Sequence, residues 1–189
     1  MRNLSILIVF VILSGCARVP MTNRRQAKMI PASQMQSMSY QQYAQFMQQH
    51  TRSTNSTYVN MVKNSGKKIK DAVVRYMNSH ARYRKRIKGY AWEFNVVEDN
   101  QLNAWCMPGG KVCFYTGILP VCQNEEGVAV VMGHEIAHAI AAHGNERMSQ
   151  GMMAQGVGLG LSVFMANKPA ASQELFNKAF GIGLSLIHI

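Results

Sequence analysis

The sequence predicts an α+β fold that is mostly helical, with a small antiparallel or mixed sheet beside one long helix. Apolar residues recur at helical spacing over 40–50 and 58–80. Three short segments between residues 92 and 116 are instead rich in aromatic and β-branched residues and are separated by turn signals. With 189 residues, 48% of them hydrophobic, the chain can bury a core, so a wholly disordered protein is excluded.

Four helices are predicted, over 40–50, 58–80, 125–148 and 172–180. Ser39 precedes the first and Asn124 the third, and both residue types cap helix N-termini. Glu125 and Glu126 follow Asn124, where the positive end of the helix dipole favours carboxylates. These signals make the third helix the best defined of the four at its start.

Three short strands are predicted, over 92–98, 104–107 and 112–116. Pro108, Gly109 and Gly110 form a tight turn between the last two. If Gly109 and Gly110 are a two-residue loop, Cys106 and Cys113 lie opposite each other, three positions outside it on either side. A disulfide could then join Cys106 to Cys113.

The amino terminus resembles a lipoprotein export signal. An apolar run over 4–13 follows a short positive start, and is too short to span a bilayer but suits a secretory signal. It ends in Ser-Gly-Cys16, which resembles the lipobox of bacterial lipoproteins. The resemblance implies a signal peptide over 1–15, lipidation of Cys16, a tether over 16–38 and a folded domain over 39–189. An ordinary signal with a chance Cys, or a short anchor, is the alternative.

The positive charge is concentrated in the first half of the chain. Residues 1–90 carry a net charge of +15 and residues 91–189 carry −4. Export predicts a location in the bacterial cell envelope, facing the periplasm. The lipoprotein resemblance implies the outer membrane over the inner, because Ala17 stands where an Asp would signal retention in the inner membrane. Nucleic acid is then not an expected partner. The basic residues are expected to face lipid headgroups or acidic partners, or to form a solvated helix face.

Residues 134–138 form an HExxH motif. On a helix, His134 and His138 lie one turn apart on the same face, where each imidazole can bind one Zn²⁺ at about 2.0–2.1 Å. Glu135 lies beside them and can take a proton from the water that zinc acidifies. The motif predicts one zinc per chain and hydrolysis of peptide bonds. The alternative is a pair of core histidines, which would leave a costly unpaired carboxylate.

The spacing of later residues excludes one subclass of zinc protease. A metzincin has a third His ten residues after the first, but that position is Gly144. His143 follows His134 by nine residues, which is about 180° around a continuous helix. His143 therefore cannot reach the same metal unless the helix breaks, and a structural or supporting role is expected for it.

Two stretches carry a family resemblance: WEFNVVEDNQLNAWCMPGGKVCFYTGILP and EEGVAVVMGHEIAHAIAAH. They resemble the membrane-associated zinc endopeptidases related to HtpX and the CAAX prenyl proteases, in particular the LoiP- and BepA-like periplasmic lipoproteins and the mitochondrial stress proteases. The resemblance covers roughly residues 40–185. It implies a zincin-like fold of the gluzincin type, with His134 and His138 as metal ligands and Glu135 as base. It also implies that an extended substrate pairs with the strand containing Val112, Cys113, Phe114 and Tyr115.

The resemblance further implies a third zinc ligand, a Glu on a later helix. After His138 the acidic residues are Glu146 and Glu174, and neither stands in the family's motif. Glu174 could reach the metal only if the intervening loop folds back. The third ligand is therefore expected beyond the end of this chain, which we interpret as truncated. The expected function is an endopeptidase, membrane-bound through Cys16, that removes misfolded or misassembled envelope proteins. The alternatives are a non-catalytic chaperone or assembly factor with the protease fold, and an inactive fragment.

Overall fold

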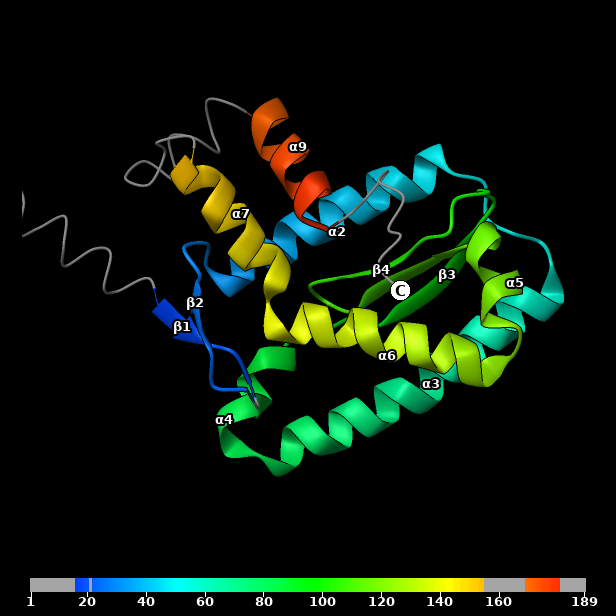
Figure 1. Ribbon diagram of the computed structural model, residues 1–189, viewed down its shortest axis with the longest axis horizontal. Helices are drawn as coiled ribbons and strands as arrows, with labels where there is room; N and C mark the ends of the chain where they lie inside the picture. The colour runs from blue at the N-terminus through cyan, green and yellow to red at the C-terminus, as the bar shows by residue number, and fades with distance from the viewer. Residues whose placement is uncertain (1–15, 21, 155–168, 181–189) are drawn as a thin grey trace, which may run out of the picture.

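The computed structural model describes residues 16–20, 22–154 and 169–180. It confirms the α+β class, with helices surrounding one small mixed sheet (Figure 1). The strands of that sheet are β3 (Glu93–Val97), β4 (Ala104–Met107) and β5 (Lys111–Tyr115). Their order is β3-β5-β4, with β3 parallel and β4 antiparallel to β5. Each strand begins and ends within one residue of its predicted bounds.

The helices are α2 (Ala32–Gln49), α3 (Ser56–Ser79), α4 (Ala81–Arg84), α5 (Leu119–Cys122), α6 (Glu125–Ala141), α7 (His143–Ala154) and α9 (Pro169–Phe180), with 3-10 turns η1 (Lys85–Ile87) and η2 (Thr116–Ile118). The long helix predicted over 58–80 is confirmed as α3. Among the described helices, none has the length and apolar character needed to cross a bilayer.

The core lies on both faces of the sheet, because successive strand residues point to opposite sides. On one face, Cys106 and Phe114 belong to an apolar cluster that includes residues of α3 and α6. On the other face, Trp105 and Tyr115 belong to a second cluster with residues of α2, α7 and α9. Helix α6 contacts both α3 and β4, so it is held between them. Packing between α3 and β4 therefore fixes the position of the helix that carries the HExxH motif.

The third predicted helix is in fact two helices. Helix α6 ends at Ala141, and Ala142 adopts a left-handed conformation with φ of 60° before α7 starts at His143. The prediction of one helix to Met148 is wrong because alanine favours continued helix locally, whereas tertiary packing redirects the chain. Gly144 shows how close that packing is: a Cβ there would lie 2.1 Å from the Phe180 ring of α9.

The segment predicted as a tether contains folded structure. Strands β1 (Cys16–Arg18) and β2 (Arg25–Ala27) form a hairpin, and α2 begins at Ala32 rather than at residue 40. Ile30 is 1% exposed, and its carbonyl accepts a hydrogen bond from Asn145 of α7 at 2.7 Å. The polar composition of this stretch hid its role, because these contacts join residues that lie more than 100 positions apart in sequence.

The predicted disulfide does not fit the register of the β4–β5 hairpin. Met107 pairs with Lys111, so the loop has three residues, and Cys106 lies opposite Val112 while Cys113 lies opposite Trp105. A shift of one residue reverses the face to which a side chain points. Cys106 and Cys113 therefore lie in different core clusters, and both are free thiols.

Candidate metal centre

Helix α6 is fastened at its N-terminus by local and tertiary hydrogen bonds. The Asn124 side chain accepts from the backbone N–H of Gly127 at 2.9 Å, as the sequence predicts for a cap. From α3, the Ser65 hydroxyl donates to the Glu125 carbonyl at 3.1 Å and Asn64 donates to the Glu125 carboxylate at 2.9 Å. These bonds fix the start of the helix, and thus the direction of its metal-binding face two turns later.

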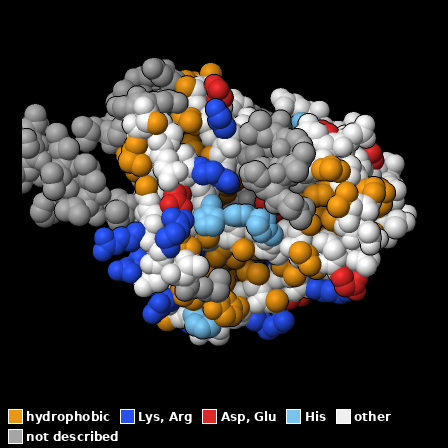
Figure 2. All heavy atoms as spheres, viewed as in Figure 1, with side chains coloured by type: hydrophobic (Ala, Val, Ile, Leu, Met, Phe, Trp, Pro, Cys, Tyr) orange, Lys and Arg blue, Asp and Glu red, His pale blue; other side chains and the backbone are white. Residues whose placement is uncertain are grey.

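The two imidazoles of the motif converge as the helical spacing predicts. The Nε2 atoms of His134 and His138 lie 2.8 Å apart, with their rings nearly perpendicular. Two nitrogens bound to one tetrahedral zinc would lie roughly 3.3 Å apart, so small ring rotations allow both to bind the same ion. Figure 2 shows histidine side chains reaching the surface in a continuous group. The donor pair therefore fits zinc and is accessible from solvent.

Burial shifts the pKa values of two residues of the motif, Glu135 and His138. Burial raises the pKa of Glu135 to about 7, against the opposing positive charge of Arg147. Burial, together with the charges of His134, His143 and Arg147, lowers the pKa of His138 to about 4. At neutral pH His138 is therefore uncharged and keeps a lone pair for a metal. Glu135 can gain or lose a proton near working pH, as a general base requires.

A third histidine joins the pair because of the break after α6. The Nδ1 atoms of His138 and His143 lie 2.5 Å apart. When Nε2 of His138 binds a metal, its Nδ1 carries the proton and donates to His143, an arrangement that orients metal-ligating histidines. The sequence argument allowed His143 to approach only if the helix breaks, and the helix does break at Ala142, where no local signal revealed it.

The described residues contain no set of three His, Cys, Asp or Glu side chains that could enclose a metal. Glu146 is held by Arg24 of the amino-terminal segment, through two hydrogen bonds of 2.7 and 2.6 Å. Glu174 is exposed on α9. Neither acid after His138 is thus a ligand here, and a Glu as the third ligand stays a prediction.

The strand predicted to bind substrate cannot do so by edge pairing. Strand β5, which contains Val112, Cys113, Phe114 and Tyr115, is the central strand of the sheet and is paired on both sides. The sequence showed where the strand is but not its place in the sheet order. In the described part of the chain, the open edge on the side of α6 belongs to β4, which no further strand pairs with.

Comparison with known proteins identifies the family. The model of peptidase family M48 matches residues 67–188. The mitochondrial metalloendopeptidase OMA1 of Schizosaccharomyces pombe is 47% identical over 58 residues, which are 31% of this chain and 17% of the relative. The OMA1 protein of Saccharomyces cerevisiae is 44% identical over 66 residues, 34% of this chain and 19% of the relative. A putative β-barrel assembly-enhancing protease of Vibrio cholerae is 38% identical over 50 residues, 26% of this chain and 10% of the relative.

These relatives also correct the expected location. The two yeast proteins are mitochondrial, and their matches cover more of this chain than the Vibrio match does. The prediction of a bacterial envelope protein that faces the periplasm is therefore wrong. The matched segments are less than a fifth of each relative's length. The family match, in contrast, covers more than half of this chain and includes the HExxH helix, so the chain belongs to peptidase family M48, a family of zinc-dependent metalloproteases.

Proposed function

We propose that this chain provides two metal ligands and the general base of a zinc endopeptidase, and that the enzyme cleaves misfolded polypeptides at a membrane. The observation that carries the proposal is the convergence of His134 and His138 at 2.8 Å with Glu135 beside them. The relatives' names support proteolysis, and the resemblance to membrane-associated proteases supports the substrate class.

The residues of α6 have separate roles in peptide hydrolysis. His134 and His138 would hold the zinc, which supplies a Lewis acid for the peptide carbonyl and acidifies water. Glu135, with a pKa of about 7, accepts the proton of the attacking water and returns it to the leaving amine. His143 holds the ring of His138 in the orientation that directs Nε2 outward.

We place the substrate on β4 instead of β5. The ladder bond from Tyr115 N–H to Asn103 C=O sets the alternation of β4, so the backbone groups of Ala104 and Cys106 point to the open edge. An extended peptide could add there as a further strand beside α6. Every residue of β4 is 4% exposed or less, so the peptide must displace the groups that cover this edge before it pairs.

Casein cleavage by the complete enzyme that contains these residues tests the catalytic proposal. Cleavage should stop when a zinc chelator is added and in Glu135→Gln, which keeps the metal because Glu135 is not a ligand. Glu126→Gln changes an exposed acid on the same helix and should cleave like the unaltered chain. Cleavage that persists in chelator or in Glu135→Gln would exclude the metal-dependent mechanism.

One observation favours a second candidate, a chaperone or assembly factor without catalysis. Only two metal ligands converge among the described residues, and a catalytic zinc site normally has three protein ligands. This candidate predicts that unfolded casein binds without being cut and that binding is unchanged by chelator. Measuring binding and cleavage in the same samples separates the two functions.

Membrane attachment through Cys16 stays a prediction. Cys16 is the first residue of β1, so an acyl group there would be joined to the hairpin that carries Arg24. Mass spectrometry of the chain purified from its natural membrane would show the added acyl mass. An unmodified thiol on Cys16, or cleavage elsewhere, would exclude this anchor.

A further inference from the structure

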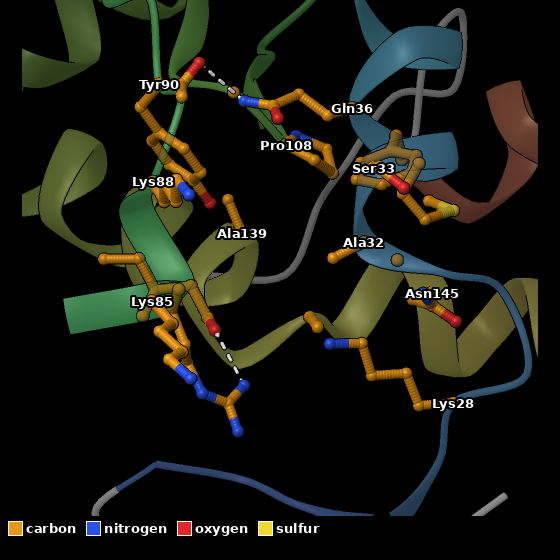
Figure 3. Close-up of a pocket in the computed structure, with 18 residues that line it drawn as sticks. Lys28, Ala32, Ser33, Gln36, Lys85, Lys88, Tyr90, Pro108, Ala139 and Asn145 are labelled. Carbon is orange, nitrogen blue, oxygen red and sulfur yellow. Dashed lines mark hydrogen bonds between the residues drawn. The ribbon is translucent and has the colours of Figure 1, made fainter. Parts of the chain in front are cut away.

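A cavity of about 590 Å³ lies at the C-terminal end of α6 (Figure 3). It is bounded by Ala139 at the end of α6, Ala32 at the start of α2, the segment after η1, and Pro108 in the β4–β5 turn. Its volume is in the range of small-molecule sites, which is about 300–1,000 Å³. The proposed protease mechanism uses none of the residues that line it.

The cavity is lined by four cationic side chains, Lys28, Lys85, Arg86 and Lys88, and by no acidic residue in the part of the chain that the structure describes. In Figure 3, Lys28 lies on one side of the cavity and Lys85 and Lys88 lie on the other. Lys28 and Arg86 are half-buried. Within the described residues, neither forms an ion pair. The cavity therefore concentrates positive charge without a counter-ion.

Arg86 is held in place by backbone carbonyls. Its guanidinium donates to the Arg18 carbonyl at 2.6 Å and to the Ile140 carbonyl at 3.5 Å. Ile140 is in the last turn of α6, where the carbonyl groups form the negative end of the helix dipole. These neutral acceptors orient the guanidinium but leave its full charge, so the cation is preorganised for an anion.

Lys28 and Arg86 repel each other inside this environment. Burial and then the charge of Arg86 lower the pKa of Lys28, and burial lowers the pKa of Arg86. The charge on Lys28 thus opposes folding while no anion is bound. An anion placed between the two cations would reverse the sign of that effect.

The remaining wall is largely apolar. Met35 and Phe180 are buried side chains that line the cavity, and Ile140 adds a third apolar surface. The nearby amides are already engaged: Asn145 donates to the Ile30 carbonyl and Gln36 to the Gly89 carbonyl. The cavity therefore presents cationic side chains next to an apolar surface, with few free neutral hydrogen-bond donors.

We propose that this cavity binds a phosphate group, with Lys28 and Arg86 as the contacting cations and the apolar wall beside it for a hydrocarbon chain. Arg and Lys both pair strongly with phosphate oxygens, and several cations around one site favour an anion of more than one charge. A lipid headgroup and free phosphate share this chemistry. The apolar wall favours the lipid, and the two sources can be separated by experiment.

The test measures the thermal unfolding midpoint of the full chain with dodecyl phosphate, kept below its micelle concentration, and in parallel with inorganic phosphate, dodecanol and dodecyltrimethylammonium. Dodecyl phosphate should raise the midpoint saturably, because a ligand that binds only the folded state stabilises it. Dodecanol and the cationic amphiphile should not. Stronger binding of dodecyl phosphate than of inorganic phosphate identifies the lipid as the source, and equal binding identifies free phosphate.

Lys28→Met supplies the decisive variant. It should weaken phosphate binding about tenfold or more, as expected for a lost hydrogen bond between charged groups, while the ligand-free midpoint stays equal or rises. Lys67→Met removes an exposed lysine of α3 outside the cavity and should bind like the unaltered chain. The proposal is overturned if neither phosphate compound stabilises the chain, if Lys28→Met binds normally, or if Lys67→Met loses as much affinity. Poly-glutamate is measured in the same way as a carboxylate polyanion. The proposal is also overturned if Lys28→Met weakens the binding of poly-glutamate but not that of phosphate.

Discussion

The ring of His143 contacts the ring of His138 through their Nδ1 atoms, 2.5 Å apart, although the two residues belong to different helices. The contact lies on the side of His138 opposite the nitrogen that faces His134. His143 therefore orients the His138 ring through Nδ1, while Nε2 of His138 remains available to bind a metal.

The first prediction concerns this support. His143→Ala should lower zinc affinity by about ten- to a hundredfold, because outer-shell partners orient the ligating imidazole. His143→Asn keeps an acceptor and should recover part of the loss. Competition against a fluorescent chelator measures the affinity, and His80→Ala, an exposed histidine at the end of α3, is the control. Equal zinc affinity in His143→Ala and the unaltered chain would show that His143 does not support the site.

A second prediction tests the helix break. Ala142 has φ of 60°, a conformation that costs about 1–2 kcal/mol for residues with a Cβ and that glycine adopts freely. Ala142→Gly should therefore raise the free energy of unfolding, by about 1 kcal/mol or less after the entropy of the unfolded glycine is counted. Ala141→Gly, at the last residue of α6, should lower it. Chemical denaturation of both variants measures the contrast, and a stabilising Ala141→Gly with a destabilising Ala142→Gly would contradict the break.

The third prediction is that the stability contributed by the ion pair between Arg24 and Glu146 depends on pH. The hydrogen-bonded guanidinium of Arg24 holds the pKa of Glu146 below its ordinary value. A carboxyl group whose pKa is lower in the folded state stabilises the protein above its unfolded pKa, which is about 4.3, and loses that effect as pH falls through the folded pKa. Glu146→Gln should therefore be less stable than the unaltered chain at pH 7, and the difference should shrink in acid.

Glu174→Gln provides the matched control for that titration, because Glu174 is an exposed acid on α9. Its stability should follow that of the unaltered chain across the same pH range. A Glu146→Gln deficit that stays constant down to pH 3 would mean that shape, and not charge, accounts for the contribution of Glu146.

The fourth prediction concerns the thiols. Cys106 and Cys113 are buried in separate clusters, and burial raises the pKa of both. Since the thiolate is the reactive form, a thiol reagent should leave both unmodified in the folded chain and label both after denaturation without a reductant. Thiols that become reactive only after reduction would reveal the disulfide that the hairpin register excludes.

The HExxH site was determined by the sequence itself, because the spacing of His134 and His138 sets their side chains on one face of any α-helix. The strand over 104–107 could also be predicted from local sequence, since its residue types indicate a strand and the Pro108–Gly110 turn ends it. The order of the strands, the register that separates Cys106 from Cys113, and the contact of His143 with His138 were decided only by tertiary structure. Local patterns fix periodicity, but register and helix breaks depend on packing between residues distant in sequence, such as Gly144 against Phe180 and Arg24 against Glu146.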